Sequence, residues 1–151
     1  MTAEFTRVTT LPASPPQAFE LSLSVEAHLR SMERSRERAV AGVTSGILTL
    51  GDEITWRAWH FGVPWTMTSR VTEYDPPHRF VDEQVRGPFH AFRHEHLFEA
   101  SADGCLMTDR VAFQAPFGII GRLTERVVLR RYLAHLIAER NRYLVAATAP
   151  G

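Results

Sequence analysis

Apolar and polar residues alternate through the middle of the chain, in five runs that turn-forming residues separate. Period-two alternation is typical of β-strands, because successive side chains point to opposite faces of a sheet. Proline, glycine and aspartate stand at the breaks between the runs, where they favour tight turns. The pattern predicts five strands, over Glu53–Phe61, Trp65–Tyr74, Arg79–Arg86, Phe89–Ala100 and Leu106–Gln114. Since short turns join antiparallel neighbours, these strands are expected to form an antiparallel meander.

The two ends of the chain have different patterns. Near the N-terminus, an alternating run up to Leu11 predicts a first strand, and Ser14 and Ser24 are typical N-caps of two short helices. Arg38–Val43 is expected to form a further strand. At the C-terminus, apolar residues within Arg122–Ala149 recur at helical spacing without proline or glycine, which predicts one helix of about 25 residues.

Together these elements predict an α+β domain that spans residues 1–151. A sheet with one apolar face must be covered, and only the long helix is large enough to cover it. We therefore expect a curved antiparallel sheet of about seven strands around the C-terminal helix, with two short helices closing one end. The space between sheet and helix is the expected internal cavity and ligand site.

The alternation also predicts which side chains face that cavity. His94 and His96 share a face with two phenylalanines, while charged residues occupy the other face of their strand. The strand that carries Asp82 and Gln84 has no clear apolar face, so a bulge could turn both outward. The inward polar residues are expected to be His60, Asp82, Gln84, His94, His96 and Asp109. The ligand-binding candidates are Trp56, His60, Trp65, Met67, Gln84, Phe92, His94, His96, Phe98, Met107 and Phe113.

Three interpretations of the inward histidines and carboxylates stay open. As a hydrogen-bond network, they would satisfy one another and hold the strands in register. As catalytic groups, the histidines His60, His94 or His96, oriented by one of two aspartates, Asp82 or Asp109, would transfer protons on a bound carbonyl compound. As a metal site, His94 and His96 have a usable spacing and His60 would be a third ligand, but no cysteine joins them. We expect no metal and no cofactor.

Composition and charge exclude several classes of partner. The formal net charge is zero, which argues against a nucleic-acid partner because that partner usually requires a basic surface. No apolar stretch is long enough to cross a membrane, and the N-terminus lacks a signal-peptide pattern, so we expect a cytoplasmic protein. The single cysteine, Cys105, allows no intramolecular disulfide. Six arginines on the C-terminal helix are interpreted as a solvated face that pairs with carboxylates of the sheet, in preference to a basic strip for an acidic partner or lipid headgroups: Arg122, Arg126, Arg130, Arg131, Arg140 and Arg142.

Two segments of the sequence resemble a known superfamily. They are Phe80-Val81-Asp82-Glu83-Gln84-Val85-Arg86-Gly87-Pro88-Phe89 and Phe92-Arg93-His94-Glu95-His96-Leu97-Phe98, and Pro116, Gly118 and Gly121 precede the long helix in a similar way. With the order of elements, they resemble the START-like, or SRPBCC, helix-grip domains. The most similar members are small bacterial stand-alone proteins of the polyketide cyclase/dehydrase-like and coenzyme-Q-binding-like kinds. The resemblance covers nearly the whole chain and implies a helix-grip fold with an apolar cavity, but no single chemistry.

These observations predict a protein that binds or carries a mostly apolar small molecule, such as a lipid, a quinone or a polyketide-like aromatic compound. The alternative is a cyclase, dehydratase or isomerase that uses the inward histidines and aspartates, so the sequence leaves open whether the chain is an enzyme. Trp59 and Phe61 fall on the outer face of their strand, which indicates a covered surface and favours a homodimer.

Overall fold

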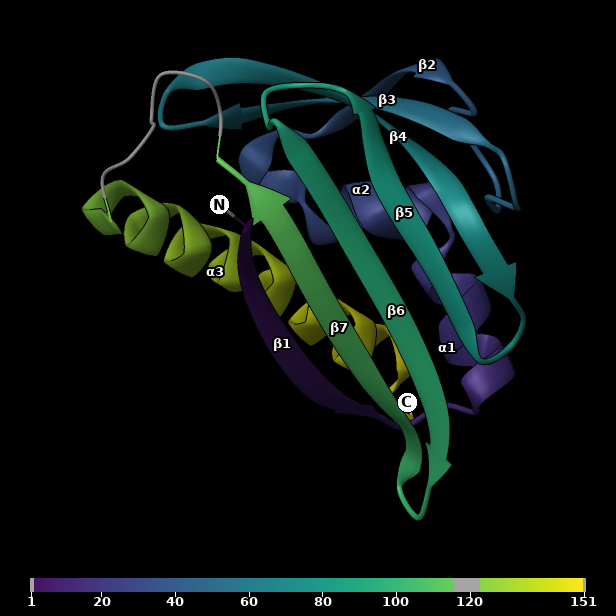
Figure 1. The fold of residues 1–151 in the computed structure, drawn as a ribbon. Coiled ribbons are helices and arrows are strands. Elements are labelled where there is room, and N and C mark those ends of the chain that lie inside the picture. Colours follow the sequence, from purple (N-terminus) through teal and green to yellow (C-terminus); the bar gives the residue numbers. More distant parts are fainter. Residues whose placement is uncertain (1, 116–122, 151) are drawn as a thin grey trace.

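The computed structural model describes residues 2–115 and 123–150, which form a curved sheet and three α-helices (Figure 1). Pro116, Gly118 and Gly121, named above for the resemblance, lie outside the described residues. In chain order the elements are β1 (Thr2–Leu11), α1 (Pro15–Ser22), α2 (Val25–Ser31), the short 3₁₀ helix η1 (Glu33–Ser35), β2 (Arg38–Gly42), β3 (Glu53–His60), β4 (Val63–Asp75), β5 (Arg79–Arg86), β6 (Ala91–Ser101), β7 (Gly104–Gln114) and α3 (Leu123–Thr148).

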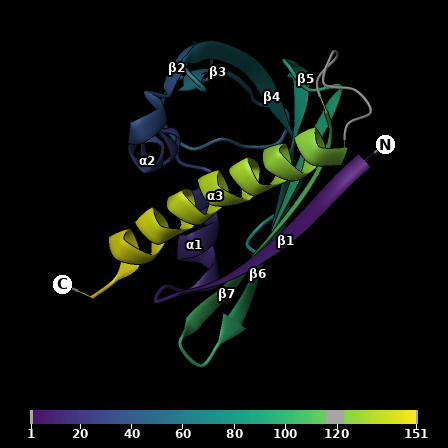
Figure 2. The ribbon, with the colours of Figure 1, turned by 90° about the vertical axis from the view of Figure 1, so that its left-hand side faces the viewer.

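The described strands form one seven-stranded sheet in the order β1-β7-β6-β5-β4-β3-β2, with every neighbouring pair antiparallel. Strands β3 to β7 follow one another as the predicted meander, and β2 adds to it beside β3. Strand β1 pairs with β7 along its whole length, from Thr2 opposite Gln114 to Leu11 opposite Cys105. Figure 2 shows α3 crossing the sheet, with β1 and β7 on one side of it and β2 and β3 curling over the other. This arrangement confirms the predicted helix-grip fold.

The helix starts agree with the N-caps that the sequence predicts. At α1 the Ser14 hydroxyl accepts a hydrogen bond from the main-chain N–H of Gln17, and the Gln17 side chain accepts one in return from the Ser14 N–H. At α2 the Ser24 hydroxyl accepts a bond from the N–H of Ala27 at 3.1 Å. Such contacts satisfy the N–H groups that a helix start leaves without a partner.

The turn between β3 and β4 is tighter than predicted. Phe61 and Gly62 both have positive φ, at 55° and 72°, as a two-residue hairpin turn with right-handed strand twist requires. The strand β4 therefore starts at Val63 instead of Trp65, and Pro64 pairs with Trp59 inside the ladder. The predicted turn was placed too late because Pro64 was interpreted as a turn residue.

The inner face of β5 depends on irregularities in its pairing with β4. The register shifts twice, between Thr68 and Ser69 and between Val71 and Glu73, and Asp82 lies opposite Val71 on one side. On the other side it lies opposite His94 of β6. Bulges of this kind bend a strand and re-aim its side chains. Here they leave Asp82 on the concave face, which resolves the ambiguity of this strand.

One end of the concave face is closed by α1, where Phe19 contacts the rings of Tyr74, Phe80 and Phe98. This packed cluster consists of Leu11, Ala18, Phe19, Leu23, Val71, Phe80, Phe98, Cys105, Met107 and Leu144. Burial raises the pKa of the Cys105 thiol, in keeping with a core residue. A smaller cluster joins Phe5, Val111 and Phe113.

The outer surface of the β3–β4 turn is apolar. Trp59 is 43% exposed, as the alternation predicts. Phe61 is 65% exposed, but it does not share the outer face with Trp59: it stands in the turn, and its ring lies 4.5 Å from that of Tyr132 on α3, at the edge of the cavity described below. The homodimer and the cytoplasmic location stay predictions. Among the described residues, no helix combines the length and apolar character that crossing a membrane requires.

Candidate functional site

A cavity of about 300 Å³ lies beyond the packed cluster, between the sheet, α2 and α3. Its walls come from β3, β4, β5 and β6 on the sheet side and from α2, α3 and the segment before β2 on the other side. Most of the lining is apolar, and a few polar groups gather on facing walls. This combination is typical of small-molecule sites.

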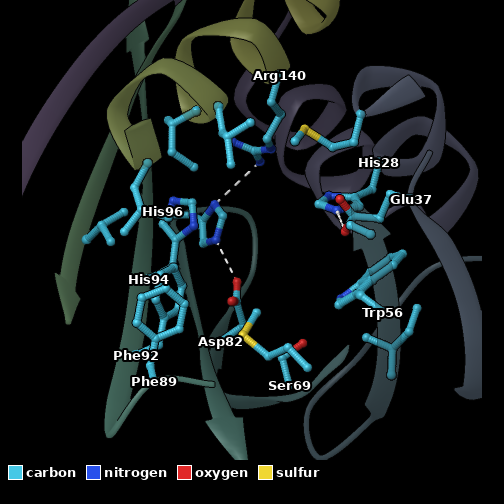
Figure 3. Close-up of a pocket in the computed structure, with 18 of the residues that line it drawn as sticks. His28, Glu37, Trp56, Ser69, Asp82, Phe89, Phe92, His94, His96 and Arg140 are labelled. Carbon is cyan, nitrogen blue, oxygen red and sulfur yellow. Dashed lines mark hydrogen bonds and ion pairs between the residues drawn. The ribbon is translucent and has the colours of Figure 1, made fainter. Parts of the chain in front are cut away.

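The wall formed by β5, β6 and β7 carries two histidine–aspartate pairs, of which Figure 3 shows His96–Asp82. His94 Nε2 lies 2.8 Å from Asp109 Oδ1, and His96 Nε2 lies 2.7 Å from Asp82 Oδ2. The two imidazoles are two residues apart on one strand, so they point the same way and stack with their centroids 3.7 Å apart. Phe80 stacks on the other side of His96 at 4.0 Å, which fixes that ring at the border of the packed cluster.

The helix α3 completes this wall with two polar residues that the sequence analysis missed. Arg140 Nη1 donates to Asp109 Oδ1 at 3.2 Å and to Asn141 Oδ1 at 3.0 Å. The Asn141 amide donates to Asp109 Oδ2 at 2.8 Å and to the Thr9 hydroxyl at 3.0 Å. We name the polar cluster by its members: Asp82, His94, His96, Asp109, Arg140 and Asn141.

Arg140 was predicted to lie on a solvated helix face that pairs with sheet carboxylates; the solvated position is wrong, because the residue is buried, whereas the pairing is present, with Asp109 of β7. A signal was present in the sequence. Asn141 lies four residues after Ile137 and three before Leu144, on the apolar stripe of the helix, and Arg140 borders it. A polar pair on an inward stripe requires buried partners, and Asp109 is the matching acceptor.

Burial and neighbouring charges shift the pKa values of the polar cluster in opposite directions. Burial would raise the pKa of Asp109, but the Arg140 charge and the His94 hydrogen bond outweigh it and hold that pKa well below its usual range. Burial also works against the ionised form of Asp82, yet the hydrogen bond from His96 holds the pKa of Asp82 below its ordinary value. Burial, reinforced by His94, lowers the pKa of His96 to about 4. Both aspartates are therefore ionised at neutral pH and His96 is neutral.

Hydrogen-bond partners then fix the tautomer of His96. Because Asp82 is ionised and can only accept, the proton of a neutral His96 must be on Nε2 and point at Asp82. The other nitrogen, Nδ1, keeps its lone pair and faces Arg140 Nη2 at 3.5 Å. His96 thus links the arginine to the aspartate across the wall of the cavity, as the dashed lines in Figure 3 show.

The facing wall has a second set of polar contacts. His28 Nε2 lies 2.8 Å from Glu37 Oε1, and the His28 ring packs on Trp56 with 4.2 Å between centroids. His60 Nδ1 lies 2.6 Å from the Tyr132 hydroxyl of α3. Burial lowers the pKa of His60, with Glu37 opposing, and burial raises the pKa of Tyr132. His28 had no role assigned from the sequence, because nothing in its local pattern shows that α2 folds over the cavity.

The structure places the sequence-predicted site residues in three ways. Those that line the cavity are Trp56, His60, Trp65, Met67, Asp82, Phe92, His94 and His96. Asp109 lies fully buried behind His94. The other four are placed elsewhere: Phe98 and Met107 in the packed cluster, Phe113 with Phe5 and Val111, and Gln84 in a local clamp.

The structure explains three of these four departures. The Gln84 amide donates to the Phe89 carbonyl at 2.7 Å and its oxygen accepts from the Phe89 N–H at 3.2 Å, so Gln84 braces the β5–β6 turn. Phe98 and Met107 share the concave face with the cavity residues, but they lie under α1, which fills the space above them. Strand alternation gives the face of a residue and not what covers it.

The three histidines of the metal-site interpretation do not come together. His60 is paired with Tyr132, whereas the described groups able to share a metal ion are Asp82, His94 and His96, with one ligand atom each within 4.8 Å of the others. Their present arrangement suits hydrogen bonding better. The two imidazoles are stacked nearly parallel, so their lone pairs do not converge, and the Arg140 cation lies 3.5 Å from His96.

Comparison with known proteins agrees with this fold. Residues 2–148 match the family model described as polyketide cyclase / dehydrase and lipid transport. Among curated proteins, none matches the sequence significantly.

Similar solved structures cover nearly the whole chain. TTHA0849 from Thermus thermophilus has a TM-score of 0.73 at 16% identity, covering 99% of this chain and 100% of that one. The major latex-like protein 151 from Panax ginseng has a TM-score of 0.70 at 13% identity, covering 99% of each chain. The di-domain ARO/CYC StfQ from the steffimycin biosynthetic pathway has a TM-score of 0.76 at 14% identity, covering 97% of this chain and 50% of StfQ. At these identities the likeness concerns the fold alone.

Proposed function

The chain belongs to the polyketide cyclase / dehydrase and lipid transport family, and from that premise we propose that it binds a mostly apolar small molecule in the cavity under α3. The observation that carries the proposal is the cavity of about 300 Å³, apolar over most of its lining, beside a fully packed core. Protein interiors are normally filled to crystal-like density, so an unfilled apolar space of this size calls for an occupant.

The lining indicates the kind of molecule. Trp56, Phe92 and Leu133 offer flat and branched apolar surface from β3, β6 and α3. Aromatic side chains of this kind suit a ring system, since stacked or edge-on ring contacts add to the gain from burial. A lipid, a quinone or a polyketide-like aromatic compound would satisfy this lining, and the size of the cavity favours a compact one.

The proposal is tested by native mass spectrometry of the purified protein, followed by organic extraction of any co-purified molecule. Ala58→Phe puts a ring into the cavity from β3, and Arg57→Phe puts the same ring on the exposed face next to it as a matched control. We expect the bound mass in the parent protein and in Arg57→Phe, and its loss in a folded Ala58→Phe. A ligand retained equally by all three proteins would contradict the proposal.

An acid–base enzyme is the second candidate, supported by the His96–Asp82 pair on the cavity wall. With Arg140 as a fixed cation beside it, the pair could move a proton on a bound carbonyl compound, as aldol cyclisation, dehydration or isomerisation requires. A pKa of about 4 makes His96 a weak base at neutral pH, which is why binding comes first. Once a ligand is identified, its turnover by the parent protein and by His96→Gln decides this candidate. Equal rates would remove it.

A further inference from the structure

The two carboxylates of the polar cluster differ in the cations and hydrogen-bond donors around them. Asp109 is fully buried and has a fixed cation, because Arg140 Nη1 lies 3.2 Å from it, and the Asn141 amide fills its second oxygen. Asp82 has only the neutral His96, which donates to Oδ2 at 2.7 Å. The remaining oxygen of Asp82 has no donor among the described residues, and the side chain, 27% exposed, lines the cavity.

An ionised carboxylate can only accept hydrogen bonds, and a buried acceptor without a donor is costly. At a side chain that is 27% exposed, solvent water is able to supply that donor. A ligand that displaces the water must bring its own donor to Asp82 or leave the carboxylate desolvated and unpaired.

The facing wall of the cavity also carries carboxylates. Glu37 lines the cavity opposite the polar cluster, next to His28 (Figure 3). Asp52 lines the cavity as well. Arg140 is the cation that faces these carboxylates among the described lining residues, and Asp109 already offsets its charge. The charge that a ligand meets near Asp82 is therefore negative, and like charges brought together in an apolar enclosure repel strongly.

We propose that Asp82 determines which ligands the cavity accepts: apolar ring compounds whose polar end is a neutral hydroxyl group, with carboxylates rejected. This inference rests on the proposed binding function and specifies the ligand class for the same site. A hydroxyl can donate to the free oxygen of Asp82, an ether or ketone in the same place can only accept, and a carboxylate adds a second negative charge.

Three commercially available two-ring probes of similar size separate these cases: 2-naphthol, 2-methoxynaphthalene and 2-naphthoate. Their binding to the full chain is measured by titration calorimetry at neutral pH. A hydrogen bond to a charged group contributes about 1.5–3 kcal/mol, so we expect 2-naphthol to bind roughly 10-fold to 100-fold more tightly than either other probe. Equal affinity for 2-methoxynaphthalene, or tighter binding of 2-naphthoate, would overturn the inference without any variant being made.

Two variants locate the preference. Asp82→Asn keeps the size of the side chain and removes its charge, and it should bring the three affinities to within about 3-fold of one another, chiefly by weakening 2-naphthol and admitting 2-naphthoate. Glu83→Gln is the matched control, because Glu83 neighbours Asp82 on β5 but pairs with Arg93, on the opposite face. It should leave the preference of the parent protein unchanged. A preference that survives Asp82→Asn in a folded protein would assign it to another residue and overturn the inference.

The two proposals fail in different ways. If none of the three probes binds and no ligand co-purifies, the binding function itself is wrong, and the specificity of Asp82 falls with it. If the probes bind with equal affinity, the binding function stands and only the role of Asp82 is lost.

Discussion

Strand β6 passes through two regions of the molecule that differ although their side chains share one face. At one end, Phe98 packs under α1 against Phe19 and Phe80, and this part of the core is filled. Two residues earlier, His96 faces the cavity, followed by His94 and Phe92. The boundary falls between Phe80 and His96, whose rings stack. A single strand can thus serve as core and as binding wall, and the helix above it decides which part is which.

The two regions also hold their interiors together by different means. The packed cluster relies on apolar burial and ring contacts, which are non-directional and individually small. The cavity wall is held together by buried ionised groups that pair with one another. Asp109 contacts three partners there: His94, Arg140 and Asn141. A complete network of this kind adds little to the free energy of unfolding, but removing one member lowers that free energy strongly. Mutations should therefore act differently in the two regions.

The largest effect is expected from removing the centre of the polar network. Asp109→Ala leaves Arg140 buried without its carboxylate and should lower the free energy of unfolding by about 3–5 kcal/mol. Urea denaturation of the parent and variant measures the change. A loss below about 1 kcal/mol would mean that Arg140 escapes to solvent, and that the network does not hold this wall together.

A pair of phenylalanine truncations on β6 compares the two regions directly. Phe98→Ala opens a hole in the filled cluster and should cost about 3–5 kcal/mol, whereas Phe92→Ala only enlarges an existing cavity and should cost about 1–2 kcal/mol. The same denaturation assay measures both. Equal losses would show that the cavity region is as tightly packed in solution as the region under α1.

The pH dependence of stability should come from the cavity side. His96 has a pKa of about 4 in the folded chain and about 6.5 when unfolded, so between these values the unfolded chain binds more protons and stability falls as pH falls. We expect a loss of about 2 kcal/mol between pH 7 and pH 5, with the lowered pKa values of Asp82 and Asp109 adding a further loss below about pH 4.

Replacement of His96 provides the control for that pH profile. In His96→Gln the slope between pH 5 and pH 7 should flatten, while Phe98→Ala should shift the whole profile down without changing its shape. An unchanged slope in His96→Gln would assign the titration to another group, with His60 the next to test, since burial lowers its pKa too.

The smallest effect is expected from an ion pair on the outer face of the sheet. Arg70 bonds Glu53 across β4 and β3, with both side chains in contact with solvent. Arg70→Ala should cost less than about 1 kcal/mol, because exposed pairs lose in side-chain entropy and screening what they gain in attraction. A loss comparable to that of Asp109→Ala would remove the distinction between buried and exposed pairs on which the comparison depends.

Much of the fold could be predicted from the sequence. The alternation of β3 to β7, the N-caps Ser14 and Ser24, and the helical period of α3 are all local patterns, and each corresponds to an element of the structure. The placement of His94 and His96 on the inner face follows from the same alternation, because neighbouring residues on β6 are charged. The errors at this level are small, such as the start of β4, where Pro64 was taken as part of the turn.

The candidate site could be predicted only in part. His94, His96, Asp82 and Trp56 were identified as inward, but their partners Arg140 and His28 were not, since those lie on helices far away in the sequence. The apolar stripe of α3 indicates that Asn141 is inward, but no local pattern shows that it meets β7, nor that α2 folds over β3.

By itself, the sequence determined the order of strands and helices, most faces of the strands and the inward histidines of β6, because these depend on side chains a few positions apart. The tertiary structure alone decided which inward residues are packed and which line a cavity, and which charges are paired. Both depend on where α1, α2 and α3 come to lie over the sheet, and so on contacts between residues as distant as Asp109 and Arg140. The position of α1 leaves Phe98 in a filled core. The position of α3 brings Arg140 into contact with Asp109 and leaves Asp82 facing the cavity.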